Sequence, residues 1–368
     1  MTYRIIGQER IQQLLLSALA KNRLAHAYLF HGQAGTGKDA VALGLALHLV
    51  CQENVNWGCG KCPACRQVLN LEHPAYKFIA PVPSRPKAVK EDKYLEILRE
   101  RMLGRLANPY WPIDYNPELS TLPVISIDQI RGMKQEVMLK LSGSGYRIFH
   151  VSQIDRMTEA AANSLLKLLE EPPQRTLLIL TTSHPSRILE TIHSRCQNIH
   201  FQGMAPETLE KAFTGHWEME SGKARFLARM AGGSLQRGLQ MADEEFESQR
   251  QMAIAFLELC FGDNLLPILD WVESQSATSA KAQTVDIIRL LQTLIRDLHQ
   301  LQLGFEARVI HSDTLPLLRS FRDKHPGFQA DIALGATSQT IDYIEKNAYL
   351  PLALFSLFRQ LRQANKKV

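Results

Sequence analysis

The sequence predicts an α/β domain built around a phosphate-binding P-loop, followed by regions that are entirely helical. Residues 32–39 fit the pattern G-x-x-x-x-G-K. Apolar, β-rich segments alternate with helical segments from residue 25 to residue 201, which indicates a largely parallel sheet with helices on both faces. After residue 202 the apolar periodicity is helical throughout.

The segments around the glycine-rich stretch have the order that a P-loop requires. Residues 8–22 predict an amphipathic helix, residues 25–30 a short buried strand, and residues 40–50 an Ala/Leu-rich helix. A strand, a glycine-rich turn and a helix are the context in which this pattern binds phosphate. A glycine turn that fits the pattern by chance is the alternative.

The residues expected to contact a nucleotide are Gly32, Gly35, Thr36, Gly37 and Lys38. The glycines let backbone N–H groups approach the phosphates, and the N-terminus of the following helix adds the positive end of its dipole. The side chain of Lys38 is expected to reach the β- and γ-phosphates of ATP or ADP.

One position of the P-loop departs from the pattern. Asp39 stands where a Ser or Thr hydroxyl would hold Mg²⁺. A carboxylate at this position could still contact a metal ion, but it would also repel phosphate. The sequence therefore predicts a P-loop fold with an impaired P-loop.

Four cysteines follow the P-loop helix at short spacings: Cys51, Cys59, Cys62 and Cys65. Four thiolates at such spacings can close a tetrahedral Zn²⁺ site, which would be structural because no ligand position stays open. An iron–sulfur cluster and a set of unligated thiols are the alternatives. Clustered cysteines fit a cytosolic metal site better than a disulfide framework.

Composition is that of an ordinary globular protein of two or three domains. The 368 residues are 45% hydrophobic and 21% charged, with a formal net charge of +5. This charge permits contact with nucleic acid without requiring it. We expect no signal peptide, no membrane span and a cytoplasmic location.

The stretch 77–123 is predicted to be an insertion, because it is rich in proline and charge. It carries one predicted helix, at 94–106, and no chemistry that its residues identify. Residues 124–127 predict the end of a strand, 129–140 a helix and 142–145 a turn.

Further strands and helices complete the predicted sheet domain. Residues 147–151 and 176–182 predict buried strands, and Thr158 is expected to cap a helix over 159–171 that ends at two prolines. A helix is also predicted over 186–193.

A P-loop ATPase needs acidic residues at the end of a neighbouring strand to hold Mg²⁺ and polarise water. Here the strand at 147–151 is followed by Ser152 and Gln153, and Asp155 comes too late. Asp39 and these two positions together argue against ATP hydrolysis, whereas nucleotide binding without turnover remains compatible with the glycines and Lys38.

The remainder of the chain is predicted to be helical. Residues 206–242 predict a small helical unit that is broken at Gly232-Gly233, and long amphipathic helices follow from about 245. The apolar stripe of the helix at 284–303 is interpreted as core packing rather than as a cofactor site.

Several motifs together resemble those of bacterial clamp loaders of the AAA+ family. The resemblance rests on Ile6-Gly7-Gln8, the P-loop, the four cysteines, the run 160–173 (AAANSLLKLLEEPP), Ser194-Arg195-Cys196, and Asn347-Ala348 with the leucines that follow. It covers the whole chain except the stretch 77–123.

The resemblance implies a domain order and a set of partners. It implies an AAA+ P-loop domain over 1–202 with a four-cysteine module at 51–65, a helical lid over 203–243, and a collar domain for oligomerisation over 244–368. It implies a ring with gamma/tau and delta subunits that opens the β sliding clamp and places it on primed DNA, without contact with a membrane.

The resemblance also implies a role for Arg195. In AAA+ rings, ATP lies between subunits, and a neighbour inserts an arginine toward the γ-phosphate. A surface arginine in a salt bridge is the alternative. Gln236 takes the position of the second sensor arginine of the family, and Thr182 that of a sensor contact.

Two functions are weighed from these residues. The first is a non-hydrolysing assembly subunit that supplies an arginine in trans. The second is an active ATPase motor subunit of the gamma/tau type, which has Ser or Thr at position 39 and an Asp-Glu pair at 152–153. The missing acidic residues favour the first.

Overall fold

The computed structural model describes residues 5–111, 122–138, 145–242, 244–262, 266–278, 281–346 and 348–365. These residues form two compact units, residues 1–212 with 232–237 and residues 213–231 with 238–368. The domain boundaries predicted near 202 and 243 stay predictions. Parts of the predicted insertion and of the helix at 129–140, most of the predicted turn at 142–145, and Asn347 lie outside the described residues.

In the described part of the chain, five strands form one parallel sheet with the order β2-β3-β4-β1-β5. The central strands are almost fully buried, as expected for a parallel sheet covered on both faces. The sheet is built from β1 (Ala27–Gly32), β2 (Tyr76–Ile79), β3 (Arg147–Val151), β4 (Thr176–Thr182) and β5 (Gln197–Phe201). The predicted α/β class is confirmed.

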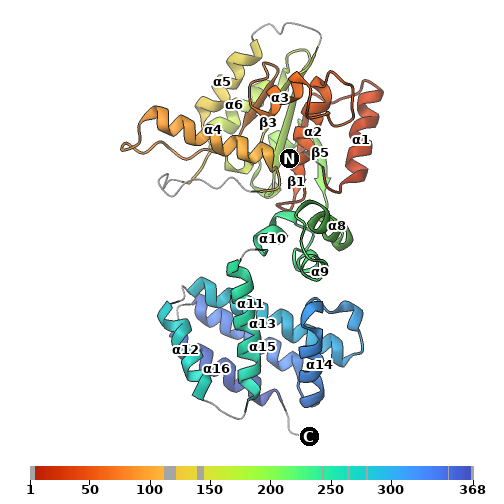
Figure 1. Ribbon diagram of the computed structural model, residues 1–368. Coiled ribbons are helices and arrows are strands. Elements are labelled where there is room, and N and C mark those ends of the chain that lie inside the picture. Colours follow the sequence, from red (N-terminus) through yellow and green to blue (C-terminus); the bar gives the residue numbers. More distant parts are fainter. Residues whose placement is uncertain are drawn as a thin grey trace. The chain divides into compact units, whose positions relative to one another are not determined.

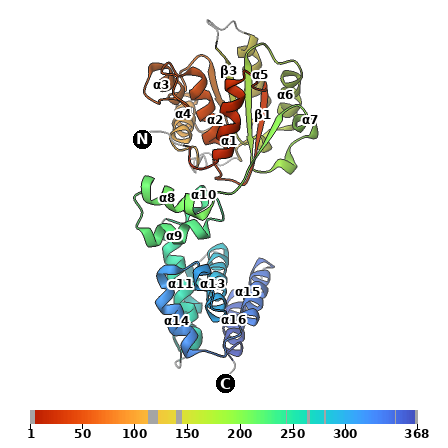
Figure 2. The same ribbon diagram turned by 90° about the vertical axis from the view of Figure 1, so that its right-hand side faces the viewer.

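Two groups of helices cover the two faces of this sheet (Figures 1 and 2). Alternate residues of β1 point to opposite faces: Phe30 packs in the cluster that includes α1, α2 and α3, while Leu29 packs in the cluster of α5 and α6. The helices that precede β5 in the described residues are α1 (Glu9–Ala20), α2 (Lys38–Val50), α3 (Pro63–Leu69), α4 (Glu91–Ala107), α5 (Ile127–Met138), α6 (Glu159–Glu170) and α7 (Glu190–His193).

Helices continue after β5, as the sequence predicts. They are α8 (Pro206–His216), α9 (Ser221–Met230), α10 (Leu235–Gln240), α11 (Glu244–Phe261), α12 (Leu266–Thr278), α13 (Lys281–Gln302), α14 (Leu315–Lys324), α15 (Ala330–Glu345) and α16 (Leu350–Gln363). The apolar stripe predicted on α13 is buried, with Leu294 and Ile295 fully enclosed. It forms the middle of a core with α11, α15 and α16, so its interpretation as core packing is confirmed.

Local signals placed several elements correctly. The hydroxyl of Thr158 accepts a hydrogen bond from the backbone N–H of Ala161 at 3.3 Å, which makes it the predicted cap of α6. The strands predicted at 147–151 and 176–182 have the observed bounds of β3 and β4.

Three local predictions differ from the structure. Strand β2 was not predicted, because it has only four residues and prolines lie on both sides of it. It falls largely inside the predicted insertion. Residues 124–125 make isolated bridges to Val82 and Met157 instead of a strand. The helix predicted over 186–193 is two short pieces, a 3₁₀ turn at Pro185–Arg187 and α7.

None of the helices over the described residues has both the length and the apolar composition needed to cross a membrane.

Candidate functional site

The P-loop joins the end of β1 to the start of α2, as the sequence predicts. Gly35 and Gly37 have φ angles of 73° and 91°, in the left-handed region that favours glycine. A Cβ atom on Gly35 would lie 2.4 Å from the Ser234 hydroxyl and 2.5 Å from Cβ of Gln236. The start of α10 therefore packs directly on the P-loop.

Lys38 is bonded to its own loop. Its Nζ atom donates hydrogen bonds to the carbonyl oxygens of Gly32 at 2.8 Å and Gln33 at 2.7 Å. Burial lowers the pKa of Lys38 to about 8, although the neighbouring carboxylates of Asp39 and Asp155 oppose this shift. The ammonium group of Lys38, which is expected to reach phosphates, is instead bonded to the backbone of the P-loop.

Asp39 points into a buried polar cluster. Its carboxylate accepts a hydrogen bond from the Arg105 guanidinium at 2.5 Å, from His150 Nε2 at 2.9 Å and from the Thr181 hydroxyl at 2.8 Å. The His150 tautomer that donates from Nε2 leaves Nδ1 to accept from the Tyr76 hydroxyl at 3.1 Å.

Burial alone would raise the pKa of the Asp39 carboxyl. The adjacent Arg105 guanidinium, together with the hydrogen bonds from His150 and Thr181, instead holds that pKa well below its usual range. Asp39 is 6% exposed and Arg105 is 8% exposed, so their ion pair lies out of reach of bulk water.

Tyr110 covers the end of the P-loop. A Cβ atom on Gly37 would lie 3.2 Å from its ring, and its hydroxyl accepts a hydrogen bond from the backbone N–H of Ile6 at 2.7 Å. Together with Arg105 and Asp39, it lines a space of about 40 Å³ in front of the loop. Pockets that hold small-molecule ligands measure roughly 300–1,000 Å³.

The two positions after β3 that carry acidic residues in a P-loop ATPase hold uncharged residues in this chain. Ser152 follows β3 directly and is 1% exposed, and Gln153 begins a 3₁₀ turn over Ile154–Arg156. Asp155 lies in that turn, where it accepts a hydrogen bond from the Thr182 hydroxyl at 2.6 Å and lies 3.1 Å from the His184 ring.

Arg195 follows α7 at the surface. Its side chain is 34% exposed and donates to the carboxylate of Glu170 at 2.7 Å and to the carbonyl of Thr191 at 3.0 Å. The side chain of Glu170 is 48% exposed. The guanidinium is thus held by an ion pair of the kind that contributes at most about 1 kcal/mol.

The sulfur atoms of Cys51, Cys59, Cys62 and Cys65 all lie within 4.8 Å of one another. A tetrahedral Zn²⁺ site with bonds of about 2.3 Å places its sulfurs about 3.8 Å apart, and Cys59 and Cys65 are already 4.0 Å apart. The four cysteines could therefore hold one metal ion with small shifts, so the donor set fits the metal that the sequence predicts.

Backbone N–H groups point at these sulfurs. Cys59 Sγ accepts from Lys61 at 3.4 Å and from Cys62 at 3.2 Å. The hydrogen bond from the Cys65 N–H lowers the pKa of Cys62 to about 6, whereas burial raises the pKa of Cys65 to about 12. A cation is needed to stabilise four thiolates at this distance.

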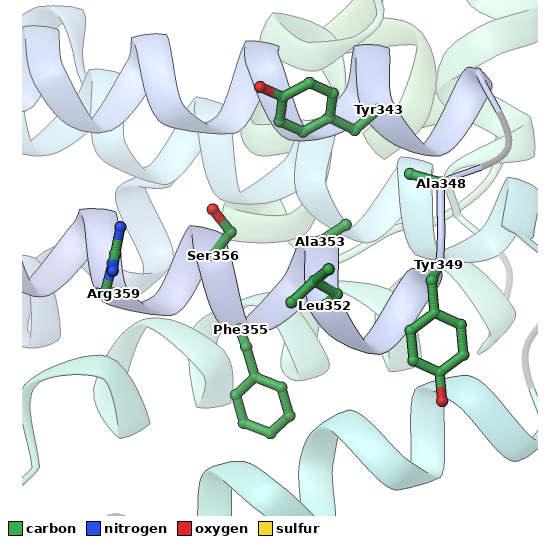
Figure 3. A pocket seen from close by; sticks show the side chains of 8 residues that line it. All are labelled: Tyr343, Ala348, Tyr349, Leu352, Ala353, Phe355, Ser356 and Arg359. Carbon is green, nitrogen blue, oxygen red and sulfur yellow. The ribbon is translucent and has the colours of Figure 1, made fainter.

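Figure 3 shows the residues that line a hollow between the end of α15 and α16. Its volume is about 520 Å³. Tyr349 and Leu352 are 74% and 68% exposed there. The described residues that line it include one charged side chain, Arg359, and no carboxylate, His or Cys. Its chemistry is that of a contact surface rather than of a reaction site.

Sequence reasoning missed Arg105, Tyr110 and His150 as parts of the P-loop site. Arg105 and Tyr110 come from the predicted insertion, and His150 lies inside the buried strand β3. The sequence contained two indications of this cluster, a histidine in an apolar strand and an Asp at position 39 of the P-loop. Neither indicates which residue the Asp contacts.

Residues 7–205 match the protein family described as "DNA polymerase III, delta subunit". The chain is 29% identical over 310 residues to "DNA polymerase III subunit delta'" of Bacillus subtilis (strain 168), covering 83% of this chain and 81% of that protein. It is 26% identical to "DNA polymerase III subunit tau" of the same organism, covering 65% of this chain and 37% of tau. The family match includes the P-loop, the four cysteines and Arg195.

A solved structure of a gamma subunit-related protein from Thermotoga maritima matches with a TM-score of 0.39 and 16% identity, covering 96% of this chain and 100% of that chain.

Proposed function

Because this chain belongs to the DNA polymerase III delta subunit family, a clamp-loader family, we propose that it works as a clamp-loader subunit of the delta' type. In this role it is a non-hydrolysing assembly subunit that supplies Arg195 in trans to a neighbouring ATPase subunit. It acts during loading of the β sliding clamp on primed DNA, in a cytoplasmic complex with gamma/tau and delta subunits.

The observation that carries this proposal is the contrast between Asp39 and Arg195. Asp39 is turned inward on Arg105, and the positions after β3 carry Ser152 and Gln153, so Mg²⁺ ligation and water activation both lack their groups. Arg195 stays at the surface, where a neighbouring subunit can reach it. An active motor subunit of the gamma/tau type would instead need Ser or Thr at position 39 and an Asp-Glu pair at positions 152 and 153.

Arg195 can leave its intrachain partner at little cost. Its ion pair with Glu170 is half exposed, and pairs of this kind are weak. A transferring phosphoryl group spreads negative charge over its equatorial oxygens, so an arginine placed against it stabilises the transition state. Arginine also offers a planar fork that fits these oxygens better than the point charge of lysine.

The test is steady-state ATPase and clamp loading by complexes rebuilt with Arg195→Ala. Arginine fingers contribute on the order of 10³–10⁵ in rate at a single site, and the loss over the whole ring should be smaller because other interfaces keep their own arginines. Arg195→Lys should restore only part of the rate. The matched control is Arg319→Ala, which removes an exposed arginine paired with Glu306. Unchanged ATPase and loading in the Arg195→Ala complex would leave Arg195 a structural residue.

For the cysteine cluster we propose one structural Zn²⁺. The compact spread of the four sulfurs supports a single ion over an iron–sulfur cluster, whose inorganic atoms would hold the ligands farther apart. The burial of Cys62 and Cys65 supports a role in folding.

For the P-loop we propose that any ATP or ADP that enters is held by Gly32, Gly35, Thr36, Gly37 and Lys38 without turnover. The hydrogen bonds of Lys38 to the Gly32 and Gln33 carbonyls would have to open first.

A further inference from the structure

Two cationic side chains at the P-loop are already bonded to groups of this chain. Lys38 is bonded to the carbonyls of Gly32 and Gln33, where it would otherwise face phosphate. The guanidinium of Arg105 lies on Asp39, the residue at the metal-ligand position of the loop. A positive charge therefore stands against position 39, as a metal ion would in an active P-loop.

Arg105 also holds the segment that covers the loop. Its second terminal nitrogen donates to the backbone carbonyl of Trp111, the residue after Tyr110. The ring of Tyr110 in turn lies on Gly37. Arg105 therefore bonds both to Asp39 and to the segment that contains Tyr110.

The insertion helix α4 sets the position of Arg105. Arg105 lies in the last turn of α4, next to Leu106, which is 1% exposed and packs in the core between the sheet and α2. The Nε atom of Arg105 is buried and has no hydrogen-bond partner among the described residues. The packing of α4 therefore holds the guanidinium in place although one of its donors is unsatisfied.

The charges explain why this closure is stable. A carboxylate buried without a partner is strongly unfavourable, so moving Arg105 away to admit a nucleotide would leave the charge of Asp39 uncompensated. An incoming triphosphate would add further negative charge beside it. Both effects oppose nucleotide entry for as long as Asp39 and Arg105 are present together.

We propose that the Asp39–Arg105 ion pair, here named the loop lock, excludes nucleotide from this P-loop, and that the loop behind it is a latent site for Mg²⁺–ATP. This inference rests on the proposed non-hydrolysing role and adds to it the residues that close the site. It gives the insertion helix α4 a function, which is to supply the cation that takes the place of bound metal and phosphate.

The test is isothermal titration calorimetry of the full chain with Mg²⁺–ATP. The wild-type chain should show no saturable binding up to about 1 mM, because the lock is closed. The double variant Asp39→Ser/Arg105→Ala removes both charges together and restores the hydroxyl of the G-x-x-x-x-G-K-[ST] pattern. It should bind at least about tenfold more tightly than the wild-type chain.

Two further variants locate the effect. Adding Lys38→Ala to the double variant should abolish the new binding, because the triphosphate loses its cation at the P-loop. The matched control Glu72→Ser/Arg99→Ala removes an exposed ion pair of 2.9 Å whose arginine also lies in α4, and it should leave binding absent.

The inference is overturned if the folded double variant shows no saturable binding. It is also overturned if the wild-type chain binds as tightly as the double variant, or if the new binding survives Lys38→Ala. Folding is checked by thermal unfolding and metal content, and Asp39→Ser/Arg105→Met, which fills more of the space, serves if the alanine variant unfolds. The measurement uses the isolated chain, so its result is independent of the Arg195 test in the rebuilt complex.

Discussion

The role of Asp39 depends on the residues that it contacts. From the sequence alone, it was interpreted as a carboxylate that could contact a metal ion or repel phosphate. In the structure it is a buried anion neutralised by Arg105 and hydrogen-bonded by His150 and Thr181. The residue therefore contributes to stability, and its contribution depends on pH.

The pKa of Asp39 is depressed in the folded chain, so its charge stabilises the fold above the unfolded pKa of about 3.9 and this stabilisation is lost as the pH falls below it. Asp39→Asn leaves Arg105 buried without its anion and should cost about 3–5 kcal/mol at pH 7. The difference from wild type should shrink between pH 5 and pH 3.

Urea unfolding followed by tryptophan fluorescence measures this difference. Replacing Trp217 and Trp271 with Phe in both proteins leaves Trp57 and Trp111 as reporters of the unit that holds Asp39. A difference that stays constant from pH 7 to pH 3 would show that the charge of Asp39 does not stabilise the fold.

The cysteine cluster gives a second prediction at the scale of one residue. Cys62 caps α3 through its sulfur, which accepts the N–H of Cys65 at 3.5 Å. Cys62→Ser should release the metal and lower the thermal stability of the knuckle, because metal binding there is coupled to folding. Elemental analysis should give about one zinc and no iron per wild-type chain and none in the variant. Cys260→Ser, which changes a buried cysteine outside the cluster, is the control. An iron–sulfur absorption band in wild type would reject zinc.

At the scale of elements, α16 presents a surface that its own unit leaves exposed. The hollow beside it exposes Tyr349 and Leu352 and is bordered by Arg359 (Figure 3). The sequence of α16, Leu350–Gln363, contains no acidic residue. Tyrosine and arginine are enriched among the residues that dominate binding energies at interfaces.

Leu352→Asp should therefore weaken assembly with gamma/tau and delta subunits, by roughly tenfold or more in apparent affinity, because it places a charge in an apolar contact. Copurification and size-exclusion chromatography at matched concentrations measure this. Leu303→Asp, at a leucine that is 53% exposed outside the hollow, should leave assembly unchanged. Equal assembly of both variants would remove α16 from the subunit interface.

At the scale of the whole molecule, the chain should depend on its partners for nucleotide chemistry. The isolated chain should show no ATP turnover above background, because Asp39, Ser152 and Gln153 supply neither Mg²⁺ ligation nor water activation. Lys38→Ala should leave clamp loading by the rebuilt complex largely intact. If this variant assembled normally but failed to load clamps, nucleotide binding at this P-loop would be required, and the proposed role would be wrong.

Local patterns in the sequence determined most of the secondary structure and two of the motifs of this protein. The alternation of strand and helix gave β1, β3 and β4 close to their observed bounds, and the stripe on α13 gave the core of the helical region. The glycine-rich turn and the four cysteines were visible for the same reason. In each case the residues that define the feature lie within a few turns of one another, so spacing alone places them together.

Only the tertiary structure decided which residues contact Asp39, the substituted position of the P-loop. Asp39 and Arg105 are 66 residues apart, and His150 is 111 residues from Asp39. No periodicity connects them, because they meet only after α4 has packed on the sheet domain and β3 has entered the sheet. A buried carboxylate takes its properties from the charges that face it, and the fold places Arg105 there.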